Sequence, residues 1–203
     1  MNSSYVVGID VGGQTSKIGV VDARGAVLAQ TVIRTDTYDI VEPYIAELAE
    51  AVKKVIAESG TEGKIRGIGV GAPNGNYYTG TIEDAPNLPW GHHTVEFAKL
   101  LSEAMNGLPV ALTNDANAAA VGEMTYGAAR GMKNFIMITL GTGVGSGIVV
   151  NGEVVYGHDG FAGELGHTIA VRGNGRTCGC GRSGCLEAYC SAMGVARTAR
   201  EWL

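Results

Sequence analysis

The most distinctive segment of the chain reads Gly163-Glu-Leu-Gly-His167 and, after an intervening loop, Cys178-Gly-Cys180-Gly-Arg-Ser-Gly-Cys185-Leu-Glu187. One His and three Cys form a complete tetrahedral set for zinc, and a site filled by four protein ligands is structural. Two disulfides or free core thiols are the alternatives, but the spacing is too cramped for neighbouring cysteines to pair. We therefore expect a structural Zn²⁺ bound by His167, Cys178, Cys180 and Cys185.

Ordering this loop is costly. The segment Arg172–Gly184 contains five glycines. Fixing its backbone costs about 1–2 kcal/mol per residue, or roughly 13–26 kcal/mol in all. Structural zinc supplies about 10–16 kcal/mol in small finger peptides. Since zinc alone would roughly break even, we expect the loop also to pack on the rest of the protein. Cys190 is expected to be a small core residue outside the metal site.

Composition limits the classes of protein to which the chain can belong. The net charge is −5 and 45% of the 203 residues are apolar. A basic run is absent from the sequence, which argues against a nucleic-acid or anionic-membrane surface. The apolar runs are too short to span a bilayer. Reduced thiols arranged for a metal indicate the cytoplasm.

The first third of the sequence predicts a sheet with a Gly-rich turn. Apolar runs predict strands at Tyr5–Asp10, Lys17–Val21 and Val27–Ile33. The turn between the first two contains Gly12, Gly13, Gln14 and Thr15. Its glycines would let backbone N–H groups approach phosphate oxygens, while Asp10 could hold hydrated Mg²⁺. A plain β-hairpin with a Gly-rich turn is the alternative.

The middle of the chain alternates helices and strands, which indicates an α/β layer. Apolar periodicity predicts helices at Val41–Ser59, Thr94–Met105 and Ala116–Ala129, and strands at Ile65–Gly71 and Pro109–Thr113. Asn114 and Asp115 follow the second strand, where ligands of open α/β sheets bind. Asp115 suits a general base, or an N-cap, and the two roles are compatible. Asn87 and Trp90 could line a pocket, or be a turn residue and a core residue.

The last third repeats the opening arrangement. A strand at Phe135–Leu140 leads into a Gly/Thr-rich turn with Thr142 and Gly143. A strand at Ile148–Val150 and a hairpin at Asn151-Gly152 follow, and the chain returns along Glu153–Tyr156. This repetition predicts an internal duplication, with domains at 1–115 and 116–203. One helix is expected at Leu186–Leu203, and the second lobe looks incomplete.

These motifs together resemble the ROK family of sugar kinases and repressors, and bacterial ROK glucokinases most. The resemblance covers essentially the whole chain. It implies an α/β, actin/hexokinase-like (ribonuclease H-like) fold of two lobes. The motifs that carry it are Gly8-Ile-Asp10-Val-Gly-Gly, Ala85-Pro-Asn87-Leu, Asn114-Asp115-Ala-Asn117-Ala-Ala, Leu140-Gly-Thr-Gly-Val-Gly145, Glu164-Leu-Gly-His167 and the three-cysteine segment ending in Leu186-Glu187.

The resemblance also implies roles for individual residues. Asp115 would be the catalytic base that takes a proton from a sugar hydroxyl. The other sugar ligands would be Asn87, Asn114, Glu164, His167 and Glu187. The residues facing the ATP phosphates and Mg²⁺ would be Asp10, Gly12, Gly13, Gln14, Thr15, Thr142 and Gly143. Gln14 stands where the family usually has Thr, which leaves the contacts of the first turn open.

The expected activity is phosphorylation of glucose to glucose 6-phosphate by ATP. The alternatives are a kinase of N-acetylmannosamine, fructose or allose, a ROK-type sugar-binding regulator, and a non-catalytic sugar-binding remnant. The regulators carry a DNA-binding module before the first strand, whereas four residues precede Tyr5 here. Family kinases run to roughly 300 residues, so this chain is expected to be a fragment with reduced activity on its own. A homodimer is expected from the family.

Overall fold

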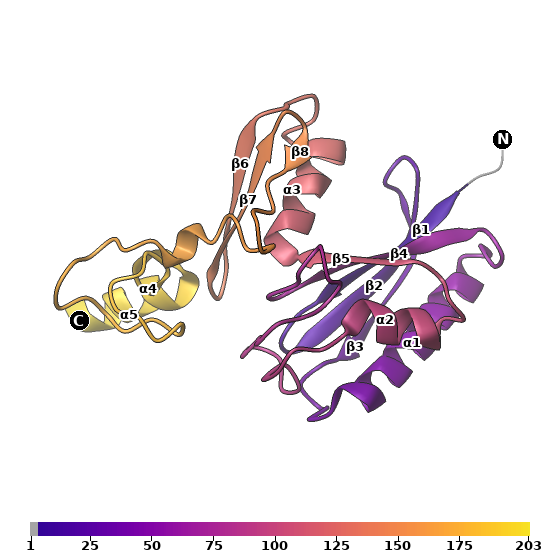
Figure 1. Ribbon diagram of the computed structural model, residues 1–203, viewed down its shortest axis with the longest axis horizontal. Coiled ribbons are helices and arrows are strands. Elements are labelled where there is room, and N and C mark those ends of the chain that lie inside the picture. The colour runs from indigo at the N-terminus through magenta and orange to yellow at the C-terminus, as the bar shows by residue number, and fades with distance from the viewer. Residues whose placement is uncertain (1–3) are drawn as a thin grey trace. The chain divides into compact units, whose positions relative to one another are not determined.

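The computed structural model describes residues 4–203, which divide into two compact units: unit 1 ends at Ala118, and unit 2 is Ala119–Leu203. The division falls inside the helix α3 (Asp115–Tyr126), whereas the sequence predicted a boundary after Asp115. Figure 1 shows the elements of both units in chain order. Each unit is described by itself below.

Unit 1 is built on a five-stranded sheet in the order β3-β2-β1-β4-β5. Its first three strands pair antiparallel, whereas β4 pairs parallel to β1, and β5 parallel to β4. All five strands lie where the apolar runs predicted them, with ends displaced by one or two residues. The strands are β1 (Tyr5–Val11), β2 (Thr15–Asp22), β3 (Val27–Arg34), β4 (Ile65–Ala72) and β5 (Val110–Asn114).

Two helices complete unit 1, and α1 (Val41–Glu58) has the predicted apolar stripe buried from Val41 to Val55. It lies against β2 and β3, while α2 (Phe97–Ala104) lies against β5 and α1 (Figure 1). The second helix was expected to begin at Thr94. It begins later because Val95 forms a backbone bridge with Ile82, which holds the preceding residues extended.

Trp90 is a core residue of unit 1, as the second of its two readings predicted. Its side chain is 2% exposed and stacks on Tyr44 and Phe97, with ring centroids 5.1 and 5.9 Å away. The connected cluster of buried apolar side chains runs from Val7 to Leu112 and lies within unit 1. Unit 1 therefore has an apolar core of its own.

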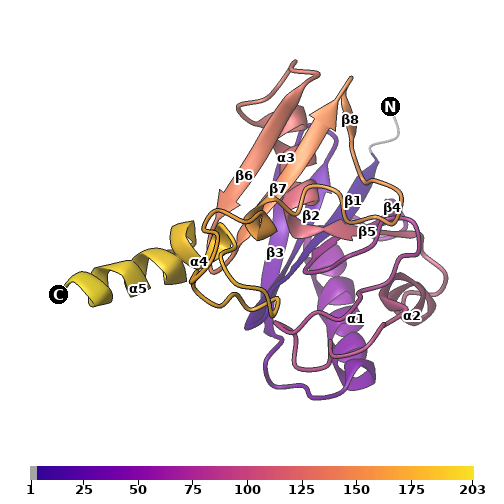
Figure 2. The ribbon, with the colours of Figure 1, turned by 60° about the vertical axis from the view of Figure 1, so that its left-hand side comes forward.

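After the end of α3, unit 2 contains a three-stranded antiparallel sheet in the order β6-β7-β8. Its strands are β6 (Phe135–Leu140), β7 (Val144–Val150) and β8 (Glu153–Val154). The middle strand begins at Val144, so the expected start at Ile148 is wrong. Cross-strand pairing with β6 continues through Gly145 and Gly147, two residues whose β-propensity is low. The meander of β6, β7 and β8 repeats that of β1, β2 and β3 (Figure 2).

The single helix expected at Leu186–Leu203 is also wrong. The chain forms α4 (Glu187–Cys190) and α5 (Ala192–Trp202), separated by Ser191 in an extended conformation. Ser191 caps α5, because its hydroxyl accepts the Gly194 N–H at 3.0 Å. Cys190 is half-buried. Within residues 4–203, no helix combines the length and the apolar character needed to cross a membrane.

Candidate active site and metal centre

Four predicted metal ligands come together in unit 2. The ligand atoms of His167, Cys178, Cys180 and Cys185 all lie within 4.8 Å of one another. His167 ends the short 3-10 helix η1 (Leu165–His167). A tight turn presents the first two thiols, with the Gly181 N–H donating to the Cys178 carbonyl at 3.0 Å and the Cys178 N–H to the Arg182 carbonyl at 2.8 Å.

The spacing of these atoms fits a tetrahedral metal site. Ligands about 2.3 Å from a tetrahedral ion lie about 3.8 Å from one another. The Cys180 and Cys185 sulfurs are 3.7 Å apart, and Cys178 Sγ lies 3.6 Å from His167 Nδ1. All four cysteines of the chain are free thiols, which removes the disulfide alternative. A His-Cys₃ donor set of these dimensions is suited to Zn²⁺.

The ligands differ in their surroundings. A hydrogen bond from the Arg182 backbone lowers the pKa of Cys180, whereas burial raises the pKa of Cys178. The second ring nitrogen of His167, Nε2, lies 4.0 Å from Glu164 Oε2. The ring can therefore present Nδ1 to the thiols while Nε2 lies toward Glu164.

Glu187 connects the metal loop to the Gly-rich turn between β6 and β7. One carboxylate oxygen accepts the Val144 N–H at 2.8 Å, and the other lies 3.6 Å from Cys178 Sγ. A Cβ on Gly143 would stand 2.5 Å from Glu187 Oε2. Gly143 thus admits the carboxylate, a packing reason for this glycine that the sequence alone did not reveal.

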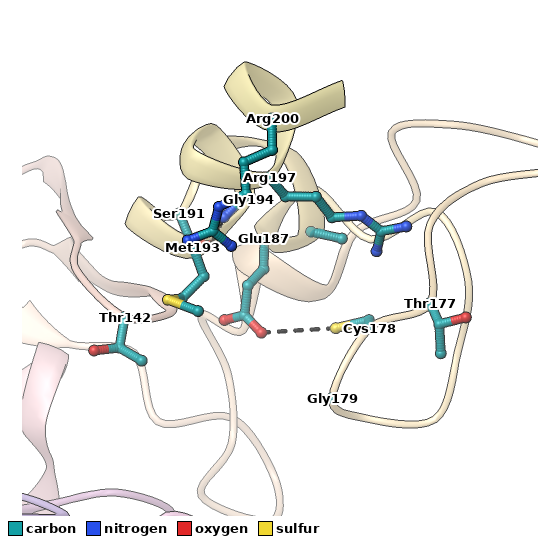
Figure 3. A pocket seen from close by; sticks show the side chains of 11 residues that line it. Thr142, Thr177, Cys178, Gly179, Glu187, Ser191, Met193, Gly194, Arg197 and Arg200 are labelled. Carbon is teal, nitrogen blue, oxygen red and sulfur yellow. Dashed lines mark hydrogen bonds between the residues drawn. The ribbon is translucent and has the colours of Figure 1, made fainter. Parts of the chain in front are cut away.

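A cavity of about 310 Å³ lies beside Glu187. Figure 3 shows the Glu187 carboxylate in it, with Thr142 on one side and Cys178 on the other. The cavity is therefore lined by residues of three segments for which the sequence predicted different roles: phosphate binding for Thr142, sugar binding for Glu187 and metal binding for Cys178. Arg197 and Arg200 of α5 also line it. Sequence reasoning missed both, because an arginine on a helix ordinarily indicates a solvated face.

The Gly-rich turn of unit 1 lies against the predicted sugar-binding loop. The Gly12 N–H donates to the Thr15 carbonyl at 3.1 Å, which closes the turn between β1 and β2. A Cβ on Gly13 would stand 2.5 Å from the Asn87 carbonyl oxygen. Because Gly13 has no side chain, the turn that contains Gln14 can lie against the backbone of Asn87. This close packing accounts for a glycine at position 13 without any role in phosphate binding. Asn87 itself is exposed.

Asp115 lies where β5 passes into α3. Its Oδ1 accepts the Ala116 N–H at 2.7 Å, and Asn114 Oδ1 accepts the same N–H at 2.9 Å. The residue is exposed, yet partial burial of its carboxyl group raises its pKa, and the charge of Asp10 raises it further. The Ala116 hydrogen bond acts in the opposite direction. Asp115 and Asp10 therefore share one electrostatic environment at the ends of β5 and β1.

Three known proteins show what this chain resembles. It is 41% identical over 203 residues to a glucokinase from Halalkalibacterium halodurans and spans 61% of that protein's length. It is 34% identical over 195 residues to a putative xylose repressor from Caldicellulosiruptor, of which it covers 47%. A ROK family glucokinase from Streptomyces griseus, solved in complex with glucose and AMPPNP, aligns with a TM-score of 0.78 and 34% identity over 98% of this chain and 61% of that one.

These likenesses confirm the expected actin/hexokinase-like α/β fold and show that the chain covers only part of its relatives. The match to the family extends over residues 6–203, almost from end to end. The chain belongs to the ROK family.

Proposed function

We propose that this protein is an ATP-dependent hexose kinase that converts glucose to glucose 6-phosphate. The observation that carries the proposal is Asp115, a carboxylate with a raised pKa at the carboxyl end of β5. A base with a pKa nearer to neutrality removes a proton more effectively than an ordinary aspartate. The glucose and AMPPNP bound to the Streptomyces griseus relative support the choice of substrates.

The reaction needs few covalent steps from the protein. Asp115 takes the proton of the sugar hydroxyl. The hydroxyl oxygen attacks the γ-phosphorus of ATP, the bond from that phosphorus to the β–γ bridging oxygen breaks, and ADP leaves. Phosphoryl transfer depends mainly on positioning and on neutralising negative charge. We assign the sugar hydroxyls to Asn87, Asn114, Glu164, His167 and Glu187, and the ATP phosphates to Gly12, Gly13, Gln14, Thr15, Thr142 and Gly143. Asp10 would hold Mg²⁺, which neutralises phosphate charge when bound.

We assign a structural Zn²⁺ to the four ligands of unit 2. The 3.6 and 3.7 Å separations between ligand atoms support this assignment. Zinc held there would fix Glu187 through the loop that carries Cys178, and so orient a predicted sugar ligand. Reduced thiols of this kind suit the cytoplasm.

A coupled assay of ADP release tests the proposal. The panel is glucose, N-acetylmannosamine, fructose, allose and xylose, with zinc content measured on the same sample. We expect the highest kcat/KM with glucose, and about one zinc per chain, as four ligands require. Tight binding of xylose without turnover of any sugar would instead favour a regulator, the activity named for the Caldicellulosiruptor relative. Failure of every sugar to bind would refute the assignments of Glu164, His167 and Glu187.

A further inference from the structure

Arg176 lies in the metal loop, and its side chain is only 12% exposed. Its Nη1 donates to the carbonyl oxygens of Ala188 and Gly194 at 3.1 and 3.2 Å, and to Thr198 Oγ1 at 2.9 Å. Its Nη2 donates to Glu201 Oε2 at 2.5 Å. All four acceptors lie on α4 and α5, so a single guanidinium connects the loop to both helices.

The backbone of Arg176 is held as firmly as its side chain. Its N–H donates to the Tyr189 hydroxyl at 2.8 Å, and its guanidinium stands 4.8 Å from the centroid of the Tyr189 ring. Its carbonyl accepts the Gly184 N–H at 2.9 Å. Since Arg176 precedes Cys178 and Gly184 precedes Cys185, this last bond closes the base of the hairpin that presents the thiols.

These contacts answer the energetic problem of the Gly-rich loop. Ordering the loop costs about as much free energy as a structural zinc supplies. A largely buried guanidinium is stable only where its donors find acceptors. The acceptors of α4 and α5 therefore hold one end of the loop in place, and less of the ordering remains for zinc to accomplish.

We propose that Arg176 is a positioning residue of the metal site, and that it couples zinc affinity to the docking of the loop on α5. The inference rests on the zinc site of the proposed function. Coupling between two binding events is reciprocal. Arg176 should thus raise the affinity for zinc, and zinc should protect α5 from opening by the same factor.

The direct test is zinc affinity, measured by competition with a chromophoric chelator. Residues that support metal ligands from outside the coordination sphere typically contribute 10–100-fold to affinity, so we expect Arg176→Met to bind zinc about 10- to 100-fold more weakly. The zinc affinity of Arg176→Lys should lie between those of the wild type and Arg176→Met, because lysine keeps the charge facing Glu201 but lacks the several donors of a guanidinium. Arg176→Lys also serves as the test variant if Arg176→Met does not fold.

Arg197→Met is the matched control. Arg197 pairs with the same carboxylate, Glu201 Oε1, at 2.8 Å, but both residues belong to α5. The zinc affinity of Arg197→Met should therefore stay within about 2-fold of the wild-type value, because an exposed i,i+4 ion pair contributes little free energy. Zinc affinities of the two Arg176 variants equal to that of the Arg197 variant would overturn the proposal.

Hydrogen exchange tests the reciprocal effect on the whole chain. Zinc should slow the exchange of the α5 amides (Ala192–Trp202) in the wild type, and slow it much less in Arg176→Lys. The amides of α1 in unit 1 report global stability and should not respond. A wild type that takes up no zinc would refute the metal site itself. Equal protection of α5 in both proteins would refute only the coupling through Arg176.

Discussion

The two units share one motif and are stabilised differently. Both contain a three-stranded antiparallel meander joined at its first turn by glycines. Unit 1 adds two parallel strands and a buried apolar cluster that includes Trp90. In unit 2 the side chains of Ile136, Ile138 and Leu140 on one face of β6 are 54–65% exposed. The remainder of unit 2 is organised by polar contacts and by the loop that carries the four proposed zinc ligands. Apolar burial thus stabilises one unit, and directed interactions stabilise the other.

Removal of the metal should produce the largest difference between the two units in sensitivity to protease. The proposed zinc would contribute about 10–16 kcal/mol to the order of its loop, and a chelator would withdraw that contribution. We expect trypsin to cleave after Arg172 and Arg182, both exposed, at least about 100-fold faster in the metal-free protein. Cleavage sites in unit 1, such as Lys53, should be unaffected and serve as the control. Equal rates with and without metal would show that zinc does not order the loop.

A substitution in the apolar core should instead destabilise unit 1 and leave unit 2 largely unchanged. Trp90→Ala removes a side chain that is 2% exposed and should destabilise unit 1 by about 3–5 kcal/mol. Trp202→Ala removes an 87% exposed ring from α5 and should cost less than about 0.5 kcal/mol. Urea unfolding gives both values. Loss of zinc from Trp90→Ala under native conditions would contradict the independence of the two sources of stability.

Part of this fold can be predicted from the sequence alone. Apolar alternation was sufficient for all five strands of unit 1 and the apolar stripe for α1, and the spacing of His167 and the cysteines predicted that these four side chains come together. The start of β7 was missed because Gly145 has no strand signal of its own. The break at Ser191 was missed because a serine on a helical pattern looks like a surface residue until its capping bond is seen.

Other features depend on contacts between distant segments. The four acceptors of the Arg176 guanidinium lie on residues as far along the chain as Glu201, so no local pattern predicts them. The contact of Glu187 with Val144 joins residues far apart in sequence. The sugar and phosphate roles of Asn87, Asn114, Glu164, Gln14 and Thr15 remain predictions.

The two Gly-rich turns can be compared by the same substitution. In Gly13→Ala the new Cβ meets the Asn87 backbone, whereas in Gly143→Ala it meets the far end of the Glu187 side chain, which can rotate at the cost of its Val144 hydrogen bond. We expect Gly13→Ala to destabilise unit 1 by about 1–3 kcal/mol and Gly143→Ala to cost less than about 1 kcal/mol. Gly8→Ala and Gly141→Ala, where a Cβ meets nothing within 4 Å, are the controls. Thermal denaturation measures all four, and a reversed order would show that the backbone at Asn87 yields readily.

The smallest expected effect concerns pH. The pKa of Asp115 is raised in the folded protein, mainly by burial. Its ionisation therefore costs stability above that pKa and nothing below the unfolded value near 3.9. Asp115→Asn should raise Tm slightly at pH 7, an effect reduced by the exposure of the residue, and the gain should vanish near pH 4.

Asp22 provides the opposite case. Hydrogen bonds from the Ala26 and Arg24 backbones lower its pKa. Its ionised form therefore stabilises the fold above the unfolded pKa, and that stability is lost as pH falls through the folded value. Asp22→Asn should lower Tm at pH 7 and have little effect in acid. Melting curves of both variants at several pH values check these signs, and a lower Tm for Asp115→Asn at neutral pH would refute the first.

The most direct test of the proposed kinase compares Asp115→Asn with the wild type in turnover and in glucose binding. A general base contributes about 10²–10⁴-fold to rate. If Asp115 is that base, turnover of glucose should fall by at least about 100-fold, while calorimetry should show glucose binding largely retained. Undiminished turnover, or loss of glucose binding with a normal residual rate, would contradict the assignment of Asp115 as the catalytic base.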